Sequence, residues 1–157
     1  MALRKIVSGG QSGVDRAALD AALALDIPCG GWCPRGRRAE DGPLPDEYPL
    51  VETPAAHYPQ RTEWNVRDSD ATLILTRGAP SGGTALTLDI ARRLGKPCLV
   101  VDLATEPGLD AVLLWLEENH TGVLNVAGPR ESHQPGIHGL ARKFLLQLLK
   151  AERGRQD

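Results

Sequence analysis

The sequence has few of the residues that stabilise small secreted proteins or bind nucleic acid. Cysteine occurs only three times in 157 residues, and this odd number argues against a disulfide framework. Aromatic residues make up 4 % and the formal net charge is −2, so the chain has neither a broad basic field nor enough stacking side chains for nucleic acid. We expect no nucleic-acid partner, no metal site, and buried thiols at Cys29, Cys33 and Cys98 rather than zinc ligands.

Long hydrophobic runs are also missing. No stretch approaches the length of a membrane span, and residues 1–8 lack the apolar core of a secretory signal. We therefore expect a cytoplasmic protein with no membrane partner. The content of 41 % hydrophobic and 24 % charged residues is that of a globular protein. The length predicts one ligand-binding domain over residues 1–152 and a flexible tail at residues 153–157.

Runs rich in β-branched residues alternate with segments of helical period, a pattern typical of βαβ units. The predicted fold class is α/β, a Rossmann-like three-layer fold. Its five-stranded parallel sheet has the expected order 2-1-3-4-5, and a long proline-rich insertion follows strand 2. The expected strands are residues 3–8, 29–32, 71–76, 97–103 and 122–127. The expected helices are residues 14–25, 62–68, 82–94, 109–119 and 137–149.

The insertion, residues 33–61, has no sustained period and is rich in proline. A structureless stretch of that length is uncommon inside a compact domain, and we interpret it as a functional lid. It carries a dense run of charge that includes Arg35, Arg37, Arg38 and Glu40. A basic lid over an anionic ligand and a solvated charged face are both compatible with this run.

Two glycine turns, residues 8–13 and 81–84, each join an expected strand to an expected helix. Glycines let the backbone approach a ligand, and free N–H groups at a helix start favour anions. Neither turn is a full dinucleotide fingerprint or a P-loop. The loop at residues 125–132 follows strand 5 and adds Arg130, whose guanidinium can bind phosphate at two points. We expect the three loops to form one site for a phosphorylated, nucleotide-like ligand.

The candidate ligand-binding residues lie in these loops, at the start of the first helix, in the insertion and in the short second helix. Asp15 has an alternative explanation as a helix-dipole partner, and Asn65 as a cap. No Ser-His-Asp or Cys-His arrangement can be assembled, so no catalytic residue is assigned. The candidates are Gly9, Gly10, Gln11, Ser12, Gly13, Asp15, Arg16, Arg37, Asn65, Ser81, Gly82, Gly83, Thr84, Asn125, Gly128 and Arg130.

Seven segments in succession resemble the molybdenum cofactor carrier family: residues 9–20, 31–34, 36–42, 61–66, 69–74, 81–84 and 125–132. The resemblance covers about residues 5–145. It implies a Rossmann-like carrier that protects the molybdenum cofactor (molybdopterin), a pterin with a phosphate and a metal-binding dithiolene, from oxidation. It also implies a homo-oligomer, a dimer or tetramer, and molybdenum enzymes as recipients.

The fold also resembles a wider group that contains cytokinin-activating nucleotide phosphoribohydrolases and nucleotide sensors. Those hydrolases share a Pro-Gly-Gly-x-Gly-Thr-x-x-Glu turn. Residues 81–87 here lack its second Gly-Thr and have Thr87 where the Glu would stand. Two alternative interpretations remain beside the carrier. One is a hydrolase that uses Asp15, Glu40 or Asp41 as acid or base, and the other is a nucleotide-sensing protein.

Overall fold

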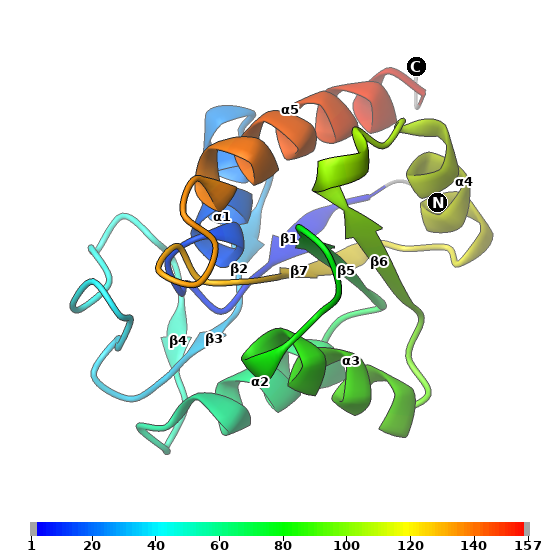
Figure 1. Cartoon of the computed structure of the whole chain (residues 1–157). Coiled ribbons are helices and arrows are strands. Elements are labelled where there is room, and N and C mark those ends of the chain that lie inside the picture. Colours follow the sequence, from blue (N-terminus) through cyan, green and yellow to red (C-terminus); the bar gives the residue numbers. More distant parts are fainter. Residues whose placement is uncertain (1–2, 156–157) are drawn as a thin grey trace.

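The computed structural model describes residues 3–155 and has a central parallel sheet between two layers of helices (Figure 1). The sheet contains β1 (Lys5–Val7), β2 (Cys29–Gly30), β5 (Ala71–Thr76), β6 (Cys98–Asp102) and β7 (Val123–Ala127). Every neighbouring pair of these strands is parallel. The predicted Rossmann-like α/β class is confirmed.

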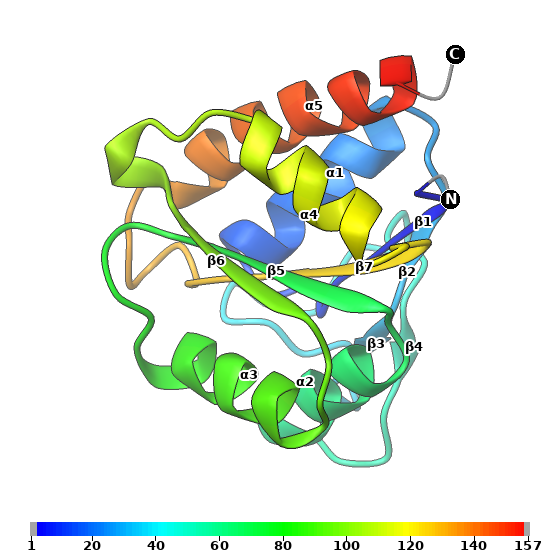
Figure 2. The ribbon, with the colours of Figure 1, turned by 90° about the vertical axis from the view of Figure 1, so that its right-hand side faces the viewer.

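Five helices cover the two faces of the sheet (Figure 2). One face carries α1 (Val14–Ala24), α4 (Asp110–Glu118) and α5 (Ile137–Arg155), and the other carries α2 (Tyr58–Arg67) and α3 (Gly82–Arg93). A short 3-10 turn, η1 (Leu103–Thr105), follows β6. Within the described part of the chain, no helix combines the length and apolar character needed to cross a membrane.

The predicted strand order is wrong for strands counted from the N-terminus. The sheet runs β2-β1-β7-β5-β6, because the last strand enters the middle of the sheet and pairs with both β1 and β5. If the strands are instead numbered in the order β5, β6, β7, β1 and β2, the sheet read from its β6 edge has the order 2-1-3-4-5. The observed topology is thus a circular permutation of the predicted one.

This order moves the point where the winding reverses. The connection from β5 to β6 runs outward through α3 on one face, and the connection from β6 back to β7 runs through α4 on the other face. Right-handed crossovers in opposite directions along a sheet place their helices on opposite faces. The reversal therefore lies between β5 and β7, and ligands bind beside such a point in open α/β sheets.

The two ends of the described chain lie together. The backbone N–H of Leu3 donates to the carboxylate of Glu152 at 3.0 Å. Where we expected a flexible tail from residue 153, α5 instead continues to Arg155, which forms an ion pair with Glu117 at 2.9 Å. The last two residues of that expected tail, 156 and 157, lie outside the described residues.

Other boundaries also differ from the expected ones. The second strand is interrupted at Gly31, whose φ of 128° few side chains adopt, and β3 (Trp32–Cys33) continues beyond it. β3 pairs with β4 (Val51–Glu52), a strand that we did not predict, in a separate two-stranded sheet. The second helix begins at Tyr58 rather than at residue 62. The insertion is therefore folded at both of its ends.

The main core lies between the sheet and the layer formed by α1, α4 and α5. All six residues of β5 are buried, as expected for a central strand covered on both faces. The buried face of α1 contains four alanines, whose small side chains allow close packing against β1 and α5. This packing fixes the strand ends from which the loops of the candidate site emerge.

Replacement of Leu73 by Ala tests the central position of β5. Leu73 is fully buried in the main core, so we expect the free energy of unfolding in urea to fall by about 2–5 kcal/mol. Leu114→Ala is the matched control, because the Leu114 side chain on α4 is 51 % exposed, and should cost about 1 kcal/mol or less. Equal losses in the two variants would contradict the assigned core.

Candidate functional site

A cavity of about 580 Å³ lies at the carboxyl ends of the central strands. The loops after β1, β5 and β7 all contribute to its wall, together with the start of α2. Because β7 lies between β1 and β5, the three loops are neighbours. The wall therefore brings together segments that are more than 100 residues apart in sequence, at the point where the winding reverses.

The cavity wall contains many of the predicted ligand-binding residues. Those that line it are Gly9, Gln11, Asp15, Asn65, Ser81, Gly83, Thr84, Asn125, Gly128 and Arg130. Those that do not are Gly10, Ser12, Gly13, Arg16, Arg37 and Gly82.

The start of α3 has free hydrogen-bond donors. Ser81 is the N-cap residue in an extended conformation, and its side chain makes no capping hydrogen bond. Within residues 3–155, the backbone N–H groups of Gly82 and Gly83 have no protein acceptor. A Cβ placed on either glycine would meet no atom within 4 Å, so the space beside them is open. This is the arrangement expected of a helix N-terminus that receives an anion.

The glycine turn after β1 is built differently. A Cβ on Gly9 would lie 2.3 Å from the Arg61 side chain, and one on Gly13 would lie 2.3 Å from the Pro129 carbonyl oxygen. The backbone N–H of Val14, at the start of α1, donates to that same carbonyl at 3.2 Å. We expected these glycines to admit a ligand, whereas the structure shows that they admit neighbouring protein segments.

A buried ion pair occupies this first loop. Arg61 Nη1 donates to the Gly9 carbonyl at 2.8 Å and lies 3.4 Å from the Asp15 carboxylate. Burial raises the pKa of Asp15 from its ordinary 3.8 to about 6, although Arg61 and the backbone N–H groups of Gln11 and Gly128 act in the opposite direction. Burial also lowers the pKa of Arg61. Desolvation thus outweighs the attraction between the two charges.

Two further donors in the cavity wall lack a protein partner. Arg61 Nε and Gln11 Nε2 are buried and have no hydrogen-bond acceptor among the described residues. The amide oxygen of Gln11 is already used, since it accepts from the backbone N–H groups of Ser12 and Glu40 at 3.0 and 2.8 Å. An unpartnered buried donor costs about 1–3 kcal/mol. Both donors are therefore available to a ligand that accepts hydrogen bonds.

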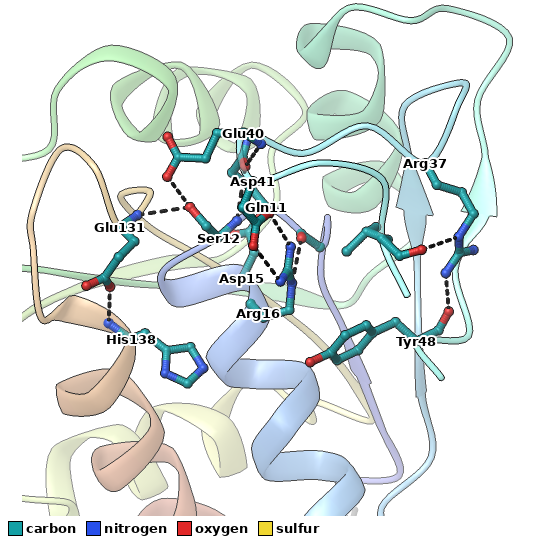
Figure 3. Close-up of polar contacts among 12 residues, drawn as sticks. Gln11, Ser12, Asp15, Arg16, Arg37, Glu40, Asp41, Tyr48, Glu131 and His138 are labelled. Atoms are coloured by element: carbon teal, nitrogen blue, oxygen red, sulfur yellow. Dashed lines mark hydrogen bonds and ion pairs between the residues drawn. The ribbon is translucent and has the colours of Figure 1, made fainter. Parts of the chain in front are cut away.

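Only the end of the insertion, at Tyr58, Pro59 and Arg61, lines the cavity, so residues 33–61 as a whole do not form the lid that we expected. Residues 34–57 contribute nothing to the wall. Glu40 instead holds the insertion against the other loops, because its carboxylate accepts from Ser12 Oγ and from Ser132 Oγ. Ser12 Oγ in turn accepts from the backbone N–H of Glu131 at 3.1 Å (Figure 3). These bonds connect the insertion, the loop after β1 and the loop after β7.

Two of the three candidate ligand-binding arginines, Arg16 and Arg37, instead stabilise the insertion. Arg37 donates to four backbone carbonyls within it. Arg16 forms a two-point ion pair with Asp41 at 3.0 and 3.1 Å and donates from Nε to the Gly10 carbonyl (Figure 3). The carbonyl-rich insertion has few N–H partners of its own because of its prolines, and the guanidinium groups supply them.

Asn65 and Asn125 line the cavity but already have protein partners. The amide group of Asn65 accepts from the backbone N–H of Trp32 at 2.8 Å and donates to its carbonyl at 2.9 Å. Asn125 Nδ2 donates to Thr72 Oγ1 on the neighbouring strand at 3.2 Å. Asn65 is therefore not the cap considered as its alternative role, and it instead connects α2 to β3.

Sequence reasoning placed only Asn65 of α2 at the site and missed the start of this helix. Tyr58 lines the cavity, and its ring lies 4.8, 5.3 and 5.5 Å from the guanidinium carbons of Arg38, Arg61 and Arg130. Pro59 near the helix start is a recognised start signal that could have placed Tyr58 and Arg61 at the site. The missed lining residues with polar side chains are Tyr58, Arg61, Thr62, Thr87, Ser132, His133 and Gln134.

Of the three carboxyl groups considered as acid or base, only Asp15 lines the cavity. Burial acts to raise the pKa of Glu40, but hydrogen bonds from Ser12 and Ser132 outweigh it and hold that pKa below its ordinary value. Hydrogen bonding to Arg16 lowers the pKa of Asp41. Across residues 3–155, no group of three His, Cys, Asp or Glu side chains has an arrangement suited to a metal ion.

The raised pKa of Asp15 predicts a specific pH dependence of stability. The folded protein favours the protonated form of the Asp15 carboxyl. Asp15 therefore adds its full contribution to the free energy of unfolding below pH 4, and this contribution is lost as the pH rises to about 6. Relative to Asp15→Asn, the free energy of unfolding of the unmodified protein should fall by about 3 kcal/mol over that range. Urea unfolding at a series of pH values measures this difference, and a constant difference would contradict the assignment.

The crystal structure of the "Putative molybdenum carrier protein" from Syntrophus aciditrophicus SB is similar, with a TM-score of 0.88 and 45 % sequence identity over 94 % of this chain and 95 % of that one. No protein with a curated description matches. The model of the circularly permutated YpsA SLOG family matches residues 6–149, and its description agrees with the permuted strand order. The chain therefore belongs to the circularly permutated YpsA SLOG family.

Proposed function

We propose that this protein binds and carries a phosphorylated, nucleotide-like small molecule in the cavity at the β5–β7 reversal. The molybdenum cofactor is the first candidate, and a nucleotide is the second. The observation that carries the proposal is a group of unpartnered donors at one cavity. They are the N–H of Gly83 in its wall and of the adjacent Gly82, the buried donors of Gln11 and Arg61, and Arg130.

Size and charge support a ligand of this class. The cavity volume of about 580 Å³ lies within the usual range for small-molecule sites. The helices α2 and α3 pack together and both begin at the cavity, so the positive ends of two helix dipoles point to one place. An anionic phosphate beside Gly82 and Gly83 would accept hydrogen bonds that the protein itself does not satisfy.

The wall also fits the particular chemistry of the molybdenum cofactor. The phosphate would lie at the start of α3, and Arg61 and Arg130 would contact the remainder of the molecule. None of the three cysteines lines the cavity, so the metal would keep its own dithiolene ligands. The name of the structure from Syntrophus aciditrophicus SB supports the same ligand. Delivery to molybdenum enzymes and self-association belong to this proposal.

Co-purification tests the ligand directly. The protein should be isolated without air, denatured gently, and the released small molecules identified by mass spectrometry. We expect a pterin phosphate, and added cofactor should survive longer in air with the protein than without it. Light scattering of the same sample gives the oligomeric state. Release of no pterin, with no binding of added cofactor, would contradict the carrier proposal.

A charge placed at the start of α3 should block binding without unfolding the protein. Gly83→Asp puts a carboxylate into open space at a helix N-terminus, where it stabilises the helix but repels a phosphate. We expect the affinity for AMP or the isolated cofactor, measured by titration calorimetry, to fall at least about tenfold with no loss of thermal stability.

Gly83→Ala is the matched control, because it adds a side chain in the same open space without charge. Its affinity should stay within about threefold of that of the unmodified protein. A Gly83→Asp variant that binds as well as Gly83→Ala would show that the phosphate does not lie at α3.

One observation favours a second function. Asp15 lines the cavity with a pKa raised to about 6, which suits a general acid or base near neutral pH. A nucleotide phosphoribohydrolase would use it to cleave the bond between base and ribose. Incubation with a panel of nucleoside monophosphates should then release free base, and Asp15→Asn should abolish the release. Tight binding with no free base would leave the carrier or a nucleotide-sensing protein.

A further inference from the structure

Three guanidinium groups gather around one tyrosine ring at the cavity. Arg38 comes from the insertion, Arg61 from α2 and Arg130 from the loop after β7, and all three lie within 5.5 Å of the Tyr58 ring centre. These four residues, which we call the arginine cluster, combine segments from three parts of the chain. Cation–π contacts hold like charges near one another here although the charges repel.

The cluster has more hydrogen-bond donors than acceptors. Among the described residues, the Arg130 side chain donates to no protein acceptor, and Arg61 Nε is buried without one. Arg38 has a single hydrogen bond, to the Ala56 carbonyl at 3.2 Å. Of the nearby carboxylates, Asp15 contacts Arg61 from 3.4 Å, and Glu40 is bonded to two serines. The cluster thus carries an excess of positive charge beside the cavity.

The arginine cluster and the start of α3 lie on different parts of the wall. Arg61 is fixed to Gly9, directly after β1, whereas Gly82 and Gly83 follow β5. β7 lies between those two strands, so their axes are about 10 Å apart. The donors therefore come from loops that follow non-adjacent strands, and the start of α3 and the arginine cluster are two places at one cavity that each favour negative charge.

We propose that the ligand carries two anionic groups, a phosphate held by the start of α3 and a second anion held by Arg61 and Arg130. This inference rests on the proposed function and specifies its ligand class. This inference fits an organic phosphate that has a second phosphoryl, carboxylate or anionic metal-oxo group at its other end. A monophosphate with a neutral end would contact only one of the two groups of donors. A bidentate guanidinium contact gives the second anion a defined orientation.

Simple synthetic probes test the inference. Hexane-1,6-diyl bisphosphate presents two phosphates at opposite ends of a flexible chain, and hexyl phosphate presents one. Titration calorimetry should give a dissociation constant at least about tenfold lower for the bisphosphate, because the second group binds within the same molecule. Amide resonances of Gly82 and Gly83 should shift with both probes, and the Nε–H resonances of Arg61 and Arg130 with the bisphosphate only.

Arg130→Gln should remove the advantage of the bisphosphate and leave hexyl phosphate unaffected. The variant should fold, because the Arg130 side chain bonds to no acceptor in the described chain. Arg142→Gln removes the same charge from an exposed position on α5, and should change neither affinity. Equal affinities of the unmodified protein for the two probes would overturn the two-anion inference alone. Failure of both probes to shift Gly82 and Gly83 would instead overturn the phosphate site itself.

Discussion

The site depends on one buried ion pair, between Asp15 and Arg61. Arg61 fills the space beside Gly9 that any side chain there would need, and its guanidinium bonds to the Gly9 carbonyl. Through this contact α1, on one face of the sheet, is joined to α2 on the other. Both charges lose water on burial, and their attraction does not compensate fully. Apolar side chains of similar volume often stabilise a fold as well as or better than a buried ion pair does, so the proposed role of Arg61 in ligand binding offers a reason for the pair.

The first loop therefore differs from the glycine loops that hold phosphate in dinucleotide-binding folds. The anion in this loop is the protein's own Asp15 carboxylate, and the backbone N–H of Val14 donates to the Pro129 carbonyl. The free N–H groups lie two strands away, at the start of α3. The winding of this permuted sheet reverses between β5 and β7. The proposed phosphate site at the start of α3 lies beside that reversal, which is where open α/β sheets bind ligands.

Much of the fold could be predicted from the sequence, because its signals are local. The buried run of β5 and the amphipathic period of α5 identify these elements without any knowledge of their neighbours. The position of β7 could not be predicted in this way, since it is set by the face on which α4 crosses. In the site, the glycines of residues 81–84 were recognisable, but Arg61 was not, because its role depends on a contact with Gly9 that is 52 residues away. Arg37 was assigned to the ligand site, whereas its partners are backbone carbonyls within the insertion, and such carbonyls have no sequence signature.

The hydrogen bond between Leu3 and Glu152 brings the first and last described segments into contact. A short linker there would make the backbone a closed ring, which could be reopened between α2 and β5. The new molecule would start at β5 and read its strands in the unpermuted 2-1-3-4-5 order. The loops after β5, β7 and β1 would each remain intact. The geometry of the pocket thus depends on the order of the elements around the ring and not on where the backbone is opened.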